Sequence, residues 1–186
     1  MSMLEKLAMG LGFTLAVSVA GAVDTPRFGQ PIAPNDLAPW DISIGPDGSG
    51  LPPGSGTPAQ GATVYAERGC ALCHGEKGSG GPGGPLVGGG PLNTTERDPV
   101  KLIGNYWPYA TTIFDYTRRA MPWQQPKTLT NDEVYALTAY ILALNKLIGE
   151  NDAMNAETLP KVKMPNRDGF VADPRPDVGP KAATRK

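Results

Sequence analysis

The sequence is poor in the side chains that most enzymes use for chemistry. Its 186 residues include one histidine and two cysteines, and all three lie in the stretch CALCHG, as Cys70, Cys73 and His74. A structural zinc site needs four ligands, and no second cysteine or histidine pair exists to supply them. A second histidine for proton transfer and a Ser/His/Asp set are also missing, so hydrolytic catalysis is not expected.

An excess of basic residues is missing as well. Lysine and arginine total 17 against 18 aspartates and glutamates, which leaves a formal net charge of -1. The sequence contains no run of lysines or arginines. A nucleic-acid partner is therefore not expected.

The longest apolar stretch is at the N-terminus and is too short for a typical transmembrane helix. Residues 7–22 read LAMGLGFTLAVSVAGA, whereas a spanning helix needs about 20 apolar residues. Lys6 precedes this stretch, and Ala20-Gly21-Ala22 forms a small-residue cleavage site. We interpret residues 1–22 as a secretory signal peptide, so we expect export to the periplasm and no stable membrane span after cleavage. Because Glu5 offsets Lys6, an uncleaved N-terminal anchor remains the alternative.

Alternating apolar and polar residues, the pattern of a strand, are also lacking. Three helical signals stand in their place. Thr57 and Pro58 form a helix start, and Gly69 marks the end of that helix. Thr130 and Glu133 form a capping box, after which apolar residues recur at helical spacing as far as Ile148. The third signal, WPYATTIFDYTRRAM, places Pro108 at a helix start and Ile113, Phe114 and Thr117 on one face. The core is therefore predicted to be all-α.

Glycine and proline, in contrast, are abundant, with 24 and 20 residues. Residues 23–56 and 151–186 contain them without helical or strand periodicity, which indicates extended arms; disordered termini are the alternative. In the first arm, four apolar residues are candidates to attach the arm to a surface: Phe28, Trp40, Ile42 and Ile44. Residues 75–91 include nine glycines but no phosphate-binding motif, so we expect a loop that passes close to a flat object.

The spacing of the two cysteines and the histidine indicates covalent haem attachment. In C-x-x-C-H, two thiols on one helical turn can each form a thioether to a haem vinyl group, and the histidine that follows can bind the iron. A redox-active C-x-x-C would need a βαβ context, which is absent. A disulfide would leave His74 unexplained. We therefore predict one haem c on Cys70, Cys73 and His74.

The region 57–150 resembles a class I c-type cytochrome, on the stretches GATVYAERGCALCHG, GPLVGG and RAMP and on the capped final helix. The resemblance implies three to five helices around one covalent haem, with long irregular arms outside the family's fold. The expected organisation is a signal peptide, an N-terminal arm, a cytochrome domain and a C-terminal tail, at residues 1–22, 23–56, 57–150 and 151–186.

The resemblance also implies a methionine as the second axial ligand of the iron. Met121 lies 47 positions after His74 (121 minus 74) and directly precedes Pro122. Because a residue before proline avoids the helical conformation, the middle helix should stop and leave Met121 on a turn. Two alternatives are that Met121 is a packing residue and that Met164, also followed by a proline, is the ligand.

Further cofactor contacts are implied by the same resemblance. Pro85 would accept a hydrogen bond from His74 through its carbonyl group, and Leu86 would pack on the haem. The candidates to bind the haem propionates, with ordinary core packing or solvent exposure as the alternative, are Tyr106, Trp107, Tyr109 and Arg118 or Arg119. The first and last helices are expected to cross where Gly61 and Tyr65 face Tyr140.

Residues 27–170 further resemble the cytochrome subunit of Sox-type sulfane dehydrogenases and of related molybdenum sulfite dehydrogenases. The resemblance rests on the stretches WDISIGPDGSGLPPGSGT, IGNYWPYATTIFDYTRRAMP, LTNDEVYALTAYILALN and LPKVKMPNRDGF. This resemblance implies an electron-transfer subunit, without catalysis of its own, that takes electrons from a molybdenum partner subunit and passes them to a downstream cytochrome. The alternatives are a freestanding carrier that delivers electrons to a terminal oxidase, and a haem enzyme or ligand sensor in which Met121 does not bind the iron.

Overall fold

The structure, a computed structural model, describes residues 29, 31–93 and 98–171. The predicted signal peptide, Phe28 and the last part of the predicted tail lie outside these residues. The chain divides after Asp41 into two compact units. The described part of the first unit contains helix α2, Pro34–Leu37. Three apolar side chains in this part of the unit are exposed: Ile32, Leu37 and Trp40.

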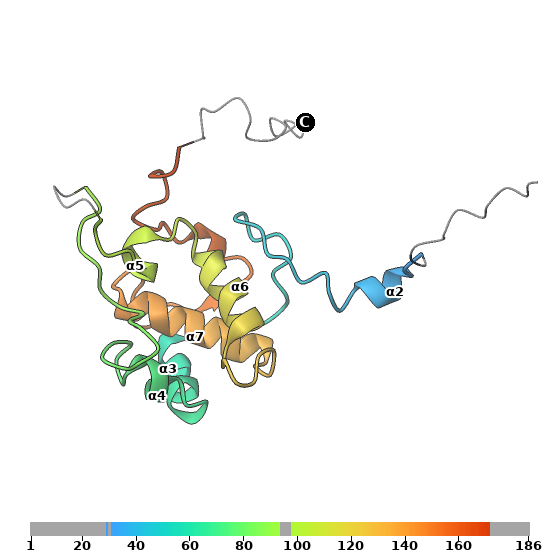
Figure 1. Cartoon of the computed structure of the whole chain (residues 1–186), viewed down its shortest axis with the longest axis horizontal. Helices are drawn as coiled ribbons and strands as arrows, with labels where there is room; N and C mark the ends of the chain where they lie inside the picture. The colour runs from blue at the N-terminus through green and yellow to red at the C-terminus, as the bar shows by residue number, and fades with distance from the viewer. Residues whose placement is uncertain (1–28, 30, 94–97, 172–186) are drawn as a thin grey trace, which may run out of the picture. The chain divides into compact units, whose positions relative to one another are not determined.

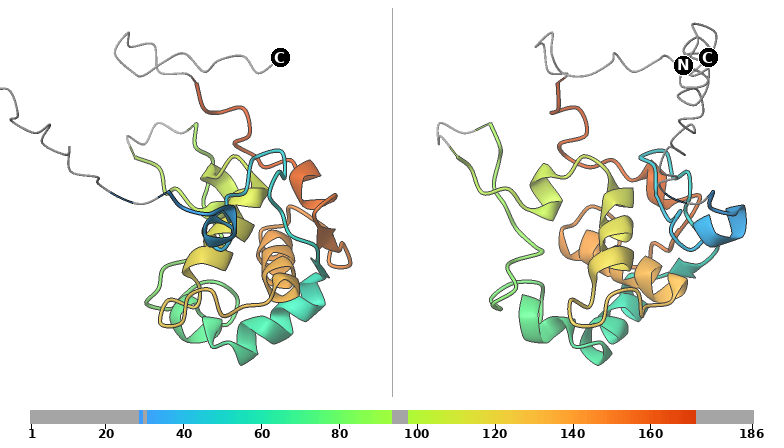
Figure 2. Two further views of the ribbon diagram at one scale, coloured as in Figure 1. Left: turned by 90° about the vertical axis from the view of Figure 1, so that its right-hand side faces the viewer. Right: turned by 45° about the vertical axis from the view of Figure 1, so that its right-hand side comes forward.

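The second unit, from Ile42 onward, is built mainly from helices (Figure 1). These are α3 (Pro58–Glu67), α4 (Cys70–His74), α5 (Ile103–Tyr106), α6 (Ala110–Ala120) and α7 (Asn131–Leu144), with a 3-10 turn at Leu159–Lys161. Helix α7 packs against both α3 and α6. In the views of Figure 2, α3 and α4 lie on the same side of this unit, and the chain after α6 runs toward them. The predicted all-α core is confirmed.

The helix ends follow local chemistry. Thr57 and Thr130 each cap a helix in a complete capping box, with Gln60 and Glu133 as the respective third helical residues. Helix α6 begins at Ala110, two residues after Pro108 and not at it. Helix α7 ends at Leu144, earlier than the predicted Ile148, because Asn145 turns its side chain back to the Ile141 carbonyl group.

Helices α3 and α7 cross at a glycine. A Cβ atom at Gly61 would overlap the backbone carbonyl of Ala136 and the side chain of Tyr140. The Tyr65 and Tyr140 rings pack with centroids 5.3 Å apart. The predicted crossing of the first and last helices at Gly61, Tyr65 and Tyr140 is confirmed.

Parts of both predicted arms belong to the folded core. Ile44 packs against the core, and Tyr135 donates a hydrogen bond from its hydroxyl to the Pro52 carbonyl at 2.9 Å. From the tail, Leu159 and Met164 are almost completely buried. For residues 42–56 and 151–171 the alternative of disordered termini is therefore wrong. Trp40 belongs to the first unit and has 72% of its surface exposed.

The two segments also meet in a short antiparallel pair, β1 (Ser55–Gly56) and β2 (Met154–Asn155), in which Gly56 lies opposite Met154. We did not expect strands. Two residues are too few to show an alternating pattern in the sequence, and the pairing joins positions far apart along the chain.

Candidate haem site

A cavity of about 480 Å³ lies between α4, the chain before and within α5, the end of α6 and the inner face of α7. Its volume is within the usual range for small-molecule sites, and its walls are largely apolar. The described residues that line it include Cys70, Cys73, His74, Pro85, Leu86, Ile103, Trp107, Ile113, Tyr116, Met121, Leu137 and Ile141. Two separate parts of the chain, α4 and the end of α6, thus bring the predicted attachment residues and Met121 to one cavity.

Helix α4 holds the two cysteines and the histidine on a single turn. Gly69 begins the turn with a positive φ of 72°, and Gly75 ends it with a φ of 78°. Both cysteines are free of disulfides and partly buried. Burial raises the pKa of the Cys70 thiol above its ordinary value. As lining residues of an apolar cavity, the two sulfur atoms are available for thioether bonds to a haem edge.

A hydrogen bond fixes the role of each nitrogen in the His74 ring. Nδ1 lies 2.8 Å from the Gly84 carbonyl oxygen. Because a carbonyl can only accept, Nδ1 donates, and the lone pair is left on Nε2, the nitrogen available to a metal. The acceptor is Gly84 and not Pro85, so the prediction is corrected by one residue: the glycine-rich loop carries the carbonyl one position earlier than the resemblance implied. Pro85 itself lines the cavity.

The glycine-rich loop 75–91 covers the attachment turn. The Gly83 backbone N–H donates to the Cys73 carbonyl at 2.6 Å. A Cβ atom at Gly83 would lie 2.9 Å from that same oxygen, closer than real Cβ atoms approach. One close approach that glycine permits is therefore to the backbone of Cys73.

Two asparagines that the sequence analysis did not single out hold the end of this loop. Asn145 donates from Nδ2 to the Leu86 carbonyl at 3.0 Å and accepts from the Gly88 N–H at 3.3 Å. Asn105 donates from Nδ2 to the Gly90 carbonyl at 2.9 Å. A side-chain amide has no sequence signal for such contacts, because its partners are backbone groups of a distant segment.

Tyr65 connects α3 to the end of the attachment turn. Its hydroxyl donates to the Gly75 carbonyl at 2.8 Å. Burial, followed by the nearby Cys70 and Tyr140, raises the pKa of Tyr65 to about 12. The hydroxyl therefore keeps its proton at neutral pH and acts as a donor.

Met121 stands where the sequence analysis placed it. It is the residue after the last turn of α6, has an extended conformation (φ -116°, ψ 147°) and lines the cavity. Met164, the alternative, is 1% exposed within the hydrophobic core, and Met154 is 4% exposed there. Neither of them lines the cavity.

The structure brings only one of the predicted propionate contacts to the cavity, Trp107. Tyr106 ends α5 and packs edge-on against Phe170, with ring centroids 5.4 Å apart. Arg167 lies over the ring of Tyr109, 4.5 Å from its centroid. Arg119 pairs with Asp115 at 2.8 Å and donates to the Ile42 carbonyl at 2.9 Å. These three residues and Arg118 do not line the cavity.

Among the described residues, the lysine and arginine side chains that do line the cavity are Arg68 and Lys101. Each is paired with a carboxylate. Arg68 lies 2.6 Å from Glu133, and Lys101 lies 2.7 Å from Asp98. The position of Arg68, two residues before Cys70, is the one signal in the sequence that would have pointed to it.

The described residues contain no group of three or more His, Cys, Asp or Glu side chains placed to hold a metal ion. Within the same residues no helix has the length and apolar character to cross a membrane. The apolar lining, the two cysteines and the imidazole of His74 fit a planar, largely apolar group that is attached through sulfur and bound by one imidazole, which is the chemistry of haem c.

Comparison with known proteins agrees with this fit. The sequence model of the cytochrome c family matches residues 58–145. Among solved structures the chain is similar to one in the sulfane dehydrogenase SoxCD from Paracoccus pantotrophus, with 39% sequence identity and a TM-score of 0.72. That likeness covers 81% of this chain and 74% of the other. No curated protein matches the chain. The chain therefore belongs to the class I c-type cytochromes, as an electron-transfer cytochrome with one covalently bound haem c.

Proposed function

We propose that the chain is the electron-transfer subunit of a sulfur-compound dehydrogenase, either a sulfane or a sulfite dehydrogenase. It would take electrons from a molybdenum-containing partner subunit and pass them to a downstream cytochrome. When bound, the haem supplies one-electron chemistry between its ferric and ferrous states. The chain's own residues hold, orient and shield that group.

In this proposal, Cys70 and Cys73 attach the haem, and His74 and Met121 bind the iron. The Gly84 carbonyl fixes the orientation of the His74 ring and increases the basicity of Nε2. Met121 supports the assignment of a carrier because a thioether ligand raises the reduction potential and leaves no open position for a substrate. Leu86, Trp107 and Ile141 exclude water from the haem faces.

Lys101 is our candidate to neutralise a haem propionate. Its side chain lines the cavity, and its partner Asp98 is exposed to solvent with 82% of its side-chain surface. Such an exposed ion pair is worth little, so a bound carboxylate can replace Asp98 at small cost. Trp107 is the second candidate, through its indole N–H.

The observation that supports a subunit over a free carrier is the extent of the structural likeness. The family model accounts for 88 residues, 58–145. The likeness to the sulfane dehydrogenase chain covers 81% of 186 residues, which is about 151. Segments outside the haem domain are therefore shared with the sulfane dehydrogenase chain, whereas a free carrier needs only the haem domain.

Export to the periplasm, with residues 1–22 as the signal, belongs to the same proposal, because haem attachment to C-x-x-C-H and a periplasmic dehydrogenase require the same compartment. Purification of the tagged chain from its native source tests it. We expect a second chain and molybdenum to coelute with the haem. A chain that elutes alone, without molybdenum, would favour the freestanding carrier.

A further inference from the structure

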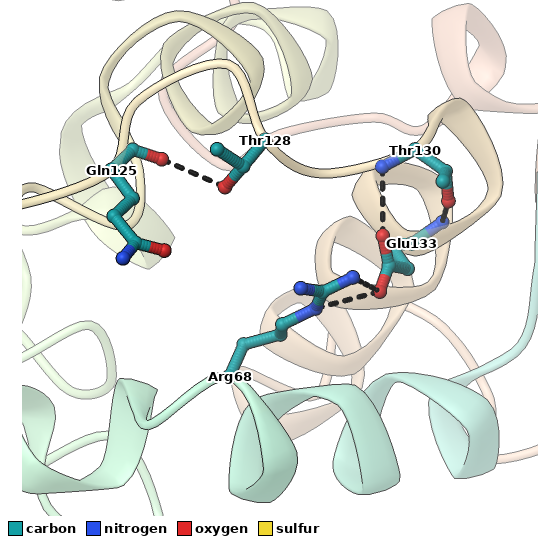
Figure 3. Close-up of polar contacts among 5 residues, drawn as sticks. All are labelled: Arg68, Gln125, Thr128, Thr130 and Glu133. Carbon is teal, nitrogen blue, oxygen red and sulfur yellow. Dashed lines mark hydrogen bonds and ion pairs between the residues drawn. The ribbon is translucent and has the colours of Figure 1, made fainter.

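The loop 121–130 carries Met121 at one end and reaches α7 at the other. Within it, the Gln125 N–H donates to the Pro122 carbonyl at 2.9 Å. The Thr128 hydroxyl donates to the Gln125 carbonyl at 2.8 Å (Figure 3). These hydrogen bonds are local to the loop. They shape it but do not fix its place relative to the haem-attachment turn.

The Glu133 carboxylate connects the far end of this loop to the chain just before that turn. Glu133 Oε2 accepts from the Thr130 backbone N–H at 2.7 Å. Its other oxygen, Oε1, accepts from Arg68 Nε at 2.8 Å and Nη2 at 2.6 Å (Figure 3). The Glu133 side chain is 19% exposed, so water competes only in part for these bonds.

Arg68 is well placed to transmit this connection. It is the residue directly after α3, lies two positions before Cys70 and lines the haem cavity. A guanidinium that gives two hydrogen bonds to one carboxylate oxygen is restrained in direction as well as in distance. The end of the methionine loop is thereby held against the segment that carries the haem.

We propose that Glu133 is a positioning residue that restrains the loop 121–130 through Arg68 and so keeps Met121 at the haem iron. The inference rests on the proposed axial role of Met121. It goes beyond a helix cap, because glutamine also serves at the third position of a capping box. The Glu133→Gln variant therefore keeps an acceptor for Thr130 and removes the charge that binds Arg68.

The test uses the full haem-containing chain in its ferric state and measures the affinity for added imidazole. Imidazole binds the iron only when the methionine leaves it, so its affinity reports the freedom of the loop. Glu133→Gln should raise that affinity about fivefold, the factor expected for a partly exposed ion pair. Arg68→Gln should give the same increase, and the double variant no more than either single variant.

Asp98→Asn is the matched control. It removes the carboxylate of the other cavity-lining cation, Lys101, so it changes the charge beside the cavity, but it leaves the loop 121–130 untouched. Tyr135→Phe is the second control, because it lowers stability by removing the bond to the Pro52 carbonyl and leaves Glu133 and Arg68 in place. Both variants should bind imidazole with the affinity of the unmodified chain.

Equal imidazole affinity in Glu133→Gln, Arg68→Gln and the unmodified chain would overturn the proposal. So would an increase of the same size in Asp98→Asn or Tyr135→Phe, since the effect would then be electrostatic or a general loss of stability. A different result would show that Met121 is not the axial ligand. The unmodified ferric chain would then lack the red-region iron–sulfur absorption band, and Met121→Ala would bind imidazole no better than the unmodified chain.

Discussion

The hydrogen bond between His74 and the Gly84 carbonyl determines which ring nitrogen of the imidazole is the donor and which keeps a lone pair. Nδ1 donates to the loop, and the lone pair of Nε2 stays available to the iron of the proposed site. The two sulfur atoms on the same turn hold the haem in place independently of its oxidation state. Attachment and ligation are thus separate functions of neighbouring residues.

Met121→Ala tests the second ligand. We expect the red-region iron–sulfur absorption band of the ferric protein to disappear and the reduction potential to fall by about 0.1 V or more, within the range of about 0.8 V over which axial ligands set haem potentials. Absorption spectroscopy and potentiometry measure both. Met164→Leu is the control, because Met164 is buried in the core away from the cavity, and it should leave the band intact.

Asn145→Ala tests the anchoring of the glycine-rich loop. The substitution leaves the Leu86 carbonyl and the Gly88 N–H without their side-chain partner. We expect the free energy of unfolding to fall by about 1–3 kcal/mol, measured by guanidinium denaturation. Asn131→Ala removes one exposed bond of 3.3 Å to the Pro53 carbonyl and should cost clearly less. Equal losses in the two variants would contradict an anchoring role for Asn145.

Among the elements, the pair α3 and α7 determines where the haem-attachment turn lies, because the turn follows α3 directly. Gly61 permits this contact. Gly61→Ala would normally favour a helix by about 1 kcal/mol. Here the new methyl group meets the Ala136 backbone, and overpacking of this kind costs about 1–3 kcal/mol or more.

We therefore expect Gly61→Ala to unfold at lower denaturant concentration. Thr63→Ala, at an exposed position of the same helix, provides the comparison and should be neutral or slightly stabilising. A Gly61→Ala protein as stable as the unmodified chain would show that the two helices can separate without loss.

The capping box of α7 gives the element a pH dependence. Partial burial raises the pKa of Glu133, but the hydrogen bonds from Thr130 and Arg68 outweigh it and hold the pKa below its ordinary value. A lowered pKa means that the contribution to stability is present above the unfolded pKa, about 4.3 for glutamate, and is lost as the pH falls through the folded pKa.

The stability difference between the unmodified chain and Glu133→Gln should therefore be largest near neutral pH and shrink in acid. Denaturant unfolding at a series of pH values measures it. A difference that stays constant down to acid pH would mean that the carboxylate is not ionised in its hydrogen bonds.

The starts of α3 and α7 were predictable because their signals are local. Thr57 and Thr130 cap helices through side chains three residues away, and Pro122 stops α6 at Met121. The end of α7 was predicted too late, because Asn145 is turned by contacts with a distant loop. Local patterns contain no information about such contacts.

The site residues, too, were predictable where the signal is local and were missed where it depends on distant parts of the chain. The spacing of Cys70, Cys73 and His74 specifies a haem because one cofactor edge requires it. The acceptor for His74 was misplaced by one residue, since the path of a glycine-rich loop depends on what it packs against. Arg68 and Lys101 were missed because the cavity is formed only when α3, α5 and α7 come together.

At the scale of the whole molecule, the segments outside the haem domain distinguish this cytochrome from a minimal carrier. Residues 42–56 and 151–171 add Ile44, Leu159 and Met164 to the packing of the core and join each other through β1 and β2. The region before them contains α2, whose apolar residues are exposed. This organisation supports a chain that functions beside a partner.

The most direct test of that account is anaerobic reduction of the haem in the purified native complex. Sulfite or a sulfane compound is added in stoichiometric amounts, and the haem absorbance is followed by stopped-flow spectroscopy. We predict conversion of the ferric haem to the ferrous form within the turnover time of the complex. A haem that stays ferric with both classes of donor, yet is reduced at once by dithionite, would contradict the account.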